Sequence, residues 1–194
     1  MGPLRKDAAR HWERLVSVAR ALVDEGTPLR LNDIARRVHL GVGTVYRHFP
    51  TAEALLETVA TPTLEALTAQ GEQAPADDEP GRALAGFLAR TIEAEVTDAS
   101  LAPVTAAATD ALSRTTELKR TLSSVGRELL GRARDAGAVR PDLTADDLVP
   151  LMCGVTYAAN VHGAPAARVE TARRHLATRL GACTSPRAEP PSRV

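Results

Sequence analysis

Apolar residues recur at intervals of three and four along most of the chain, and the alternation that marks β-strands does not persist. This spacing predicts an amphipathic helix over residues 6–25, followed by Gly26 and Pro28, because glycine suits the position after a helix and proline cannot continue one. The same periodicity predicts further helices over residues 31–38, 42–49, 81–98, 101–113, 115–136, 144–162 and 165–180. The pattern therefore predicts an all-α fold.

Cap and breaker residues mark several helix ends. Thr51 is placed to cap a fourth helix, and Pro62 is a candidate kink within it. Thr144 with Asp147 three residues later resembles a capping box. Pro150 should bend the helix that follows, because proline removes one backbone hydrogen bond from a helix interior.

Three regions follow from these signals. Residues 1–50 hold the first three helices and are predicted to form an N-terminal domain, and residues 51–182 a longer helical domain. Within the second region, the polar and acidic stretch 71–81 is predicted to be a loop. The proline-rich, polar residues 183–194 are predicted to form a disordered tail.

The stretch LGVGTVYRHFP, residues 40–50, places two glycines ahead of several polar side chains. A dinucleotide-binding loop would need a preceding strand and a third glycine, whereas a helix precedes this stretch and Tyr46 occupies the third position. A P-loop would need Lys followed by Ser or Thr, and that pair is absent. Nucleotide binding is therefore disfavoured.

The same stretch fits a helix-turn-helix. Val45 and Phe49 are four residues apart and are predicted to point inward on the second of two short helices. The polar side chains of that helix then face outward: Thr44, Arg47 and His48. Both glycines bare the amino end of the helix, which can approach a phosphate backbone or base edges. The geometry predicts a recognition helix for double-stranded DNA.

These residues resemble the signature of TetR-type bacterial transcriptional regulators. The resemblance lies in DIARRVHLGVGTVYRHFPTAEALL, with Ile34-Ala35, Gly43-Thr44, Tyr46 and His48-Phe49 in the expected places. It extends more loosely to the preceding helix and to GAVRPDLTADDL in the second half. The resemblance implies three N-terminal helices that bind DNA, followed by a longer helical domain that dimerises and usually holds a small ligand.

Three positions depart from the family pattern. His39 stands where the family usually has glycine, and Gly41 stands where a serine usually caps the recognition helix. Glycine costs only about a few tenths of a kcal/mol relative to serine at such a cap. Ala52 replaces a lysine that commonly contacts phosphate, which should lower the salt dependence of binding by about one unit per half-site.

The predicted DNA contacts comprise Arg5, Lys6, Asn32, Gly41, Val42, Gly43, Thr44, Tyr46, Arg47 and His48. Tyr46, Thr44 and His48 are expected to contact the DNA backbone, whereas Arg47 is suited equally to guanine or to phosphate. Val42 either touches a thymine methyl or covers the core. Asn32 either reaches the DNA or caps its own helix.

Charge is distributed unevenly, although the formal net charge is zero. Residues 1–50 hold nine lysines and arginines against five acids, so the N-terminal region is the basic end of the chain. No apolar run is long enough to cross a bilayer, and the charged N-terminus does not resemble an export signal. Cys153 and Cys183 fit no metal or redox spacing, and no catalytic motif is present. We expect a cytoplasmic protein without a cofactor, metal site or enzymatic activity.

The second region is expected to form a homodimer through helices 144–162 and 165–180, the latter carrying one apolar face: Val169, Ala172, Leu176 and Leu180. A small and apolar effector is expected, with these candidate contacts: Phe87, Thr91, Thr105, Leu122, Met152, Thr156 and Tyr157. Two alternatives remain, a ligand-free dimerisation scaffold and an enzymatic body, although no convergent polar residues support an enzyme. Repression, as opposed to activation, rests on the family resemblance alone.

Overall fold

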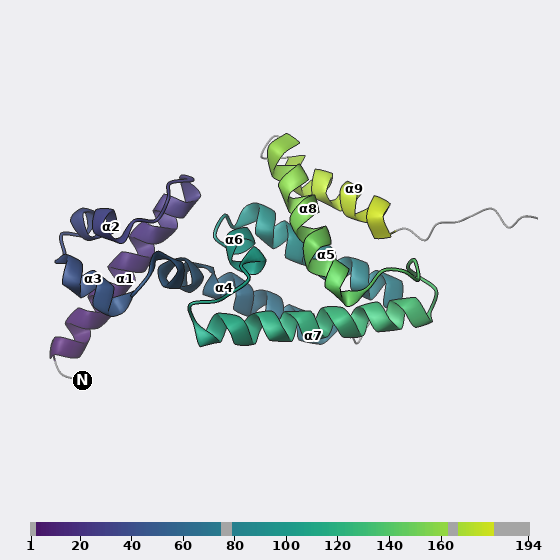
Figure 1. The fold of residues 1–194 in the computed structure, drawn as a ribbon, viewed down its shortest axis with the longest axis horizontal. Helices are drawn as coiled ribbons and strands as arrows, with labels where there is room; N and C mark the ends of the chain where they lie inside the picture. Colours follow the sequence, from purple (N-terminus) through teal and green to yellow (C-terminus); the bar gives the residue numbers. More distant parts are fainter. Residues whose placement is uncertain (1–2, 75–78, 163–166, 181–194) are drawn as a thin grey trace, which may run out of the picture.

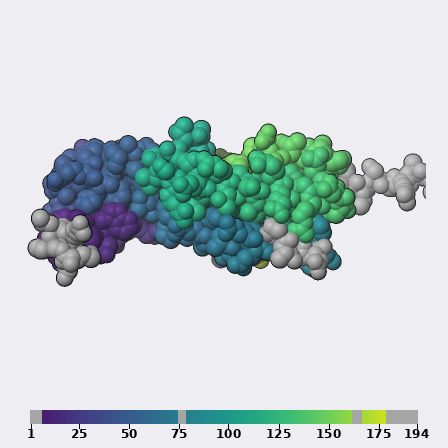
Figure 2. Space-filling view, turned by 90° about the horizontal axis from the view of Figure 1, so that it is seen from below, coloured from purple at the N-terminus to yellow at the C-terminus, as the bar shows by residue number. Residues whose placement is uncertain are grey.

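The computed structural model describes residues 3–74, 79–162 and 167–180, and this part of the chain is helical without strands (Figure 1). The α-helices are α1 (Pro3–Asp24), α2 (Leu31–Arg37), α3 (Val42–His48), α4 (Ala52–Gln73), α5 (Pro80–Thr97), α6 (Leu101–Ala106), α7 (Ser113–Asp135), α8 (Leu148–His162) and α9 (Arg168–Leu180). The molecule is elongated, with α1, α2 and α3 at one end and α4 leading into the other half (Figures 1 and 2). The predicted all-α fold is confirmed.

The first hydrophobic core joins α1, α2 and α3 to the start of α4. Its buried members are Leu15, Ala19, Leu22, Leu31, Ile34, Ala35, Val38, Val45, Phe49, Leu55 and Val59. Arg14 of α1 also donates to the Val38 carbonyl at 2.8 Å, which satisfies a backbone acceptor at the end of α2. This packing fixes the orientation of α3, because its inward side chains Val45 and Phe49 are both buried in the core.

The second core lies among α5, α7, α8 and α9, where Phe87, Leu88, Leu129 and Leu130 are buried. The apolar face of α9 belongs to this core: Ala172 is 1% and Leu176 is 4% exposed. The prediction that this face forms a dimer interface is therefore wrong for Ala172 and Leu176. Helix periodicity identifies an apolar face, but it does not distinguish packing within a chain from packing against a partner.

The predicted helix 101–113 ends earlier, because α6 stops at Ala106. Side chains satisfy the backbone of the segment that follows. The Glu57 carboxylate accepts from the backbone nitrogens of Ala111 and Leu112 at 2.6 and 2.9 Å, and Lys119 donates to the carbonyls of Val104 and Ala107. A non-helical connection is stable here because its polar groups have partners outside a helix.

Two further expectations about helix ends are corrected. The predicted loop 71–81 is shorter at its start, because α4 continues to Gln73 with Pro62 inside it. Pro150 does not bend a helix interior: α8 begins at Leu148, so Pro150 lies in its first turn, where backbone N–H groups lack intrahelical partners. The preceding capping box is confirmed, with the Thr144 backbone nitrogen 2.8 Å from Asp147 Oδ2. The predicted tail, residues 183–194, lies outside the described residues.

Candidate functional site

The outer surface of α3 is the first candidate site. Val45 is fully buried and Phe49 is 3% exposed, as the spacing predicted. On the other side, Val42 is 44% and Tyr46 is 46% exposed, and Arg47 is also exposed. Thr44 and His48 are partly buried at the edges of this surface. A short helix thus shows a mixed polar and aromatic face to solvent while its other face anchors it.

Bonds within α3 organise this surface. Arg47 donates through Nε to the Gly43 carbonyl at 3.3 Å and through Nη2 to Thr44 Oγ1 at 3.1 Å. The guanidinium therefore lies along its own helix. Gly41 is the N-cap residue, and a Cβ added at Gly43 would meet nothing within 4 Å. No contact within the chain requires glycine at position 43, so the space beside Gly43 is open to a molecule that approaches from outside.

Asn32 lies close to this surface. It is exposed in the first turn of α2, whose N-cap is Arg30 without a side-chain cap bond, so the capping alternative for Asn32 is wrong. Asn32 and Tyr46 line the same surface hollow, together with Arg36 and Thr51. The side chains of Arg5 and Lys6 lie outside the described part of the structure, and their predicted contacts stay predictions.

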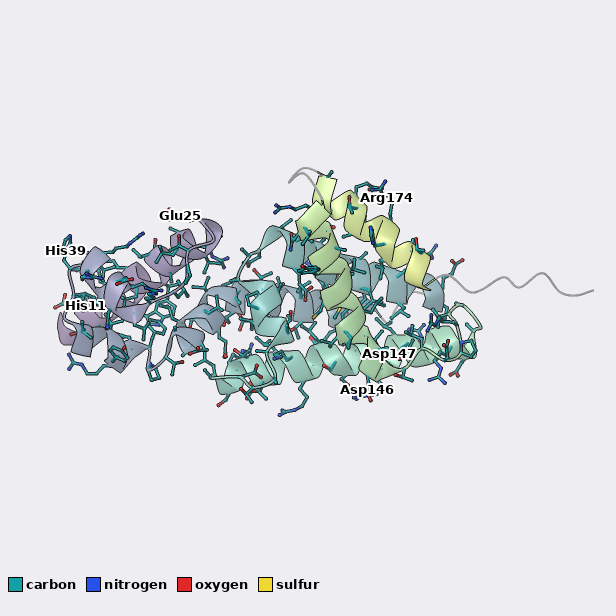
Figure 3. All side chains as sticks on the ribbon, turned by 45° about the horizontal axis from the view of Figure 1, so that its top comes forward. His11, Glu25, His39, Asp146, Asp147 and Arg174 are labelled. Atoms are coloured by element: carbon teal, nitrogen blue, oxygen red, sulfur yellow. The ribbon has the colours of Figure 1, made fainter. Side chains whose placement is uncertain are left out.

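His39 forms the turn between α2 and α3 in a left-handed backbone conformation, with φ at +53°. Figure 3 shows it at the outer tip of this helical unit. Glycine adopts this conformation at far lower cost than other residues, so the histidine is a source of local backbone strain.

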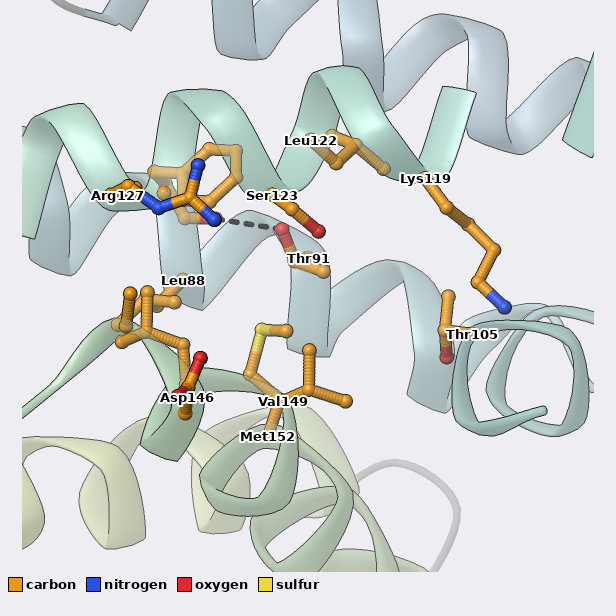
Figure 4. A pocket seen from close by; sticks show the side chains of 14 residues that line it. Leu88, Thr91, Thr105, Lys119, Leu122, Ser123, Arg127, Asp146, Val149 and Met152 are labelled. Carbon is orange, nitrogen blue, oxygen red and sulfur yellow. Dashed lines mark hydrogen bonds between the residues drawn. The ribbon is translucent and has the colours of Figure 1, made fainter. Parts of the chain in front are cut away.

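The second candidate site is a cavity of about 300 Å³ between α5, α6, α7 and the start of α8 (Figure 4). Five of the seven predicted ligand contacts line it: Phe87, Thr91, Thr105, Leu122 and Met152. The other nine wall residues comprise apolar ones, such as Leu88, Leu148 and Val149, and four polar or charged ones. A largely apolar, partly open cavity with a few polar side chains is typical of small-molecule sites.

Two predicted ligand contacts are placed elsewhere. Tyr157 is 71% exposed on α8 and does not line the cavity, so this prediction is corrected. Thr156 is buried behind the cavity wall, where its hydroxyl donates to Glu95 at 2.7 Å. Neighbouring residues of a helix point in different directions, and the sequence alone did not show which face of α8 packs against α5 and α6.

The prediction missed the charged residues of the cavity, namely Lys119, Arg127 and Asp146. Lys119 and Arg127 are eight residues apart on α7, at a spacing that places them on one side of the helix together with Leu122 and Ser123. That spacing was available in the sequence. That this face of α7 lies opposite the start of α8 could be seen only in the folded structure.

Glu95 is a buried carboxylate next to this cavity. It is 3% exposed and accepts hydrogen bonds from Thr105 and Thr156, each at 2.7 Å. Burial raises the pKa of this carboxyl, and the bonds from Thr156 and Thr105 oppose that rise. Since Thr105 also lines the cavity, Glu95 fixes the orientation of a wall residue.

A polar connection joins the two halves of the molecule. Arg20 of α1 donates to the Val59 carbonyl of α4 and, at 2.6 Å, to the Asp98 carboxylate after α5. Asp98 also accepts from Thr63 of α4 and from Ser100, which precedes α6. The α3 unit and the cavity-bearing half therefore contact one another through specific hydrogen bonds.

Two family profiles match the chain. Residues 15–59 match the profile described as bacterial regulatory proteins of the tetR family. Residues 79–179, more than half of the chain, match the C-terminal domain of SbtR-like transcriptional regulators. The chain belongs to the TetR family of transcriptional regulators. Its N-terminal helix-turn-helix is the DNA-binding domain of that family.

Solved structures of TetR-family proteins share the fold. The regulator SCO0520 from Streptomyces coelicolor is 24% identical, with a TM-score of 0.52 over 86% of this chain and 94% of its own. RolR in complex with resorcinol is 19% identical, with a TM-score of 0.56 over 90% and 97%. FadR from Bacillus subtilis with stearoyl-CoA is 13% identical, with a TM-score of 0.58 over 85% and 97%. No curated protein sequence matches significantly.

Two other kinds of site are absent from the described residues. Within the described residues of this TetR-family regulator, no three His, Cys, Asp or Glu side chains are grouped as metal ligands would be. None of its described helices has both the length and the apolar character needed to cross a membrane.

Proposed function

We propose that this TetR-family regulator is a ligand-responsive repressor that binds a palindromic operator as a homodimer. The observation that carries the proposal is the two-sided α3 helix, whose inner face is locked in the core while Tyr46 and Arg47 face solvent. A recognition helix of this kind can enter a major groove without disturbing the fold that supports it.

Within this proposal, the outward-facing residues of α3 have different roles. Tyr46, Thr44 and His48 contact the DNA backbone and set the position of the helix. Arg47 exchanges its bonds to Gly43 and Thr44 for bonds to a guanine or a phosphate. Because those bonds are exposed and local, the exchange costs little.

The exposed face of α8 supports dimerisation. Tyr157 and Val161, four residues apart, are 71% and 52% exposed. Large apolar side chains repeated on one side of a helix are typical of an interface. A symmetric pair of protomers then presents two α3 helices to half-sites about 34–36 Å apart, one turn of DNA.

The cavity supports control by a small molecule. Its volume of about 300 Å³ lies at the lower end of the range for small-molecule sites, which favours a compact effector of the size of resorcinol, the ligand of RolR, over a whole acyl-CoA such as that bound by FadR. Effector binding would favour a dimer whose α3 helices are wrongly spaced. A coupling of about 1–3 kcal/mol changes DNA affinity about 5–150-fold. The second candidate, a ligand-free scaffold, is favoured only if no molecule bound in the cavity changes DNA affinity.

The operator can be found by selecting duplexes from a random pool with the purified protein and sequencing those retained. Fluorescence anisotropy on the selected site and on single-base variants then separates the roles in α3. Tyr46→Ala should weaken binding to all sequences alike, whereas Arg47→Ala should also reduce the preference for the selected base if Arg47 contacts guanine. Arg134→Ala, at an exposed position on α7, serves as the control. Retention of no duplex in low salt would refute the proposed function.

A further inference from the structure

We propose that the effector cavity binds a compact amphipathic carboxylate, whose apolar part packs against Phe87, Leu122 and Met152 and whose carboxylate pairs with Arg127. The inference rests on the proposed function, in which this cavity is the effector site. It replaces the expectation of an apolar effector, because Arg127 lies in the cavity wall.

Two cationic side chains line the cavity, but Lys119 is already bonded. Its ammonium group donates to the Val104 carbonyl at 3.1 Å, to the Ala107 carbonyl at 2.8 Å and to Asp110 at 2.7 Å. These three acceptors match the three N–H groups of an ammonium. The Asp110 carboxylate also balances its charge. Lys119 therefore holds the α6–α7 connection in place and is not the partner of an anionic ligand.

Arg127 differs in its surroundings. It lines the cavity from α7, and Figure 4 shows its guanidinium turned over the cavity, with one nitrogen hydrogen-bonded to Thr91 and the others left to face a ligand. In the part of the chain that the structure describes, no carboxylate forms an ion pair with Arg127, although Arg114, Arg140 and Arg173 each have one. A planar guanidinium at the edge of an apolar space is suited to bind a carboxylate through two parallel hydrogen bonds.

Asp146 lines the cavity from the opposite side, in the short 3-10 helix Ala145–Asp147 before α8 (Figures 3 and 4). Its negative charge opposes an anionic ligand. Arg127 and Asp146 are both exposed, so water screens both charges, but a carboxylate bonded to Arg127 is in direct contact with its guanidinium and lies farther from Asp146 across the cavity. The attraction therefore exceeds the repulsion, and Asp146 reduces the affinity without reversing its sign.

Three probes of one shape test the charge preference: para-propylbenzoate, para-propylbenzamide and para-propylphenol. Isothermal titration calorimetry on the full-length protein without DNA measures each affinity. We expect the carboxylate to bind about tenfold more tightly than the isosteric amide, which corresponds to about 1.4 kcal/mol. Equal or weaker binding of the carboxylate, or binding of none of the three, would overturn the inference.

Three variants locate the carboxylate. Arg127→Gln should remove the tenfold preference and leave the affinity for the amide unchanged. Arg120→Gln, on the same helix and outside the cavity wall, should change neither affinity. Asp146→Asn should tighten carboxylate binding about two- to threefold by removing a like charge. Weaker carboxylate binding by Asp146→Asn would instead show a ligand held by both charges and would refute a simple anion.

The failure of this inference can be distinguished from the failure of the proposed function. Selective carboxylate binding that leaves DNA affinity unchanged would support the ligand class and contradict control by this cavity. Release of DNA by the neutral probes, with no preference for the carboxylate, would support control by this cavity and contradict the ligand class. Anisotropy measurements with labelled operator and each probe give that second readout.

Discussion

Arg20 Nη1 lies 2.6 Å from Asp98 Oδ1, and this ion pair joins α1 of the DNA-binding domain to the turn between α5 and α6. The Asp98 side chain is 12% exposed, so the pair is screened less than a surface pair. Thr63 and Ser100 donate to the same carboxylate. The Asp98 carboxylate therefore holds together α1, α4 and the turn before α6.

Acid should weaken this connection. Burial raises the pKa of Asp98, but the hydrogen bonds from Ser100, Thr63 and Arg20 outweigh it, and the net shift is downward. A lowered pKa in the folded state contributes stability above the unfolded-state pKa of about 3.9, and this stability is lost as the pH falls through the folded-state value. Asp98→Asn should lower the free energy of unfolding by about 1–2 kcal/mol at neutral pH. In urea titrations from neutral pH to pH about 3, the difference from the unmodified protein should shrink; a constant difference would contradict this.

His39→Gly should stabilise the protein. His39 holds a φ of +53°, a conformation that costs a residue with a side chain about 1 kcal/mol and costs glycine little. For a chain of this size, the melting temperature should rise by about 2–4 °C. The opposite substitution at the left-handed Gly137, Gly137→Ala, should lower it. Calorimetry of both variants checks the pair, and a fall for His39→Gly would mean that the imidazole makes a compensating contact.

Gly43→Ala should separate stability from DNA binding. Alanine favours a helix by up to about 1 kcal/mol over glycine, and the added Cβ meets nothing in the chain. The unfolding midpoint should therefore rise, while operator affinity falls because the methyl group occupies space needed by DNA. Gly131→Ala on α7 is the matched control, since it is also exposed with nothing within 4 Å. It should raise stability and leave affinity unchanged; unchanged affinity in both variants would show that DNA does not approach Gly43.

Tyr157→Asp should produce monomers. Placing a charge in an apolar interface leaves it without water or a partner, whereas Tyr157→Phe preserves the packing surface. Light scattering coupled to size-exclusion chromatography at micromolar concentration should show a dimer for the unmodified protein and for Tyr157→Phe, and half that mass for Tyr157→Asp. A dimer in all three would exclude this face of α8 as the interface.

The sequence predicted the local features of the N-terminal region well. The positions of Val45, Phe49 and Gly41 followed from helix period and cap preferences, which act over a few residues. The left-handed turn at His39 was signalled only by a departure from the family pattern, because histidine itself does not indicate that conformation.

The second half was harder to predict because its features depend on contacts distant in sequence. The early end of α6 requires Glu57 and Lys119, which lie far from the segment they support. The face of α9 that carries Ala172 and Leu176 is apolar in either packing arrangement, so periodicity did not decide between core and interface. The charged members of the cavity wall were missed for the same reason.

Glu57 also limits how the molecule can rearrange. Its carboxylate reaches from α4 to two backbone nitrogens that precede α7, and it is 4% exposed. Sliding α4 along α7 would leave the buried Glu57 carboxylate without its two N–H donors, at a cost of about 1–3 kcal/mol. The residues that lead into α7 are therefore expected to move together with α4.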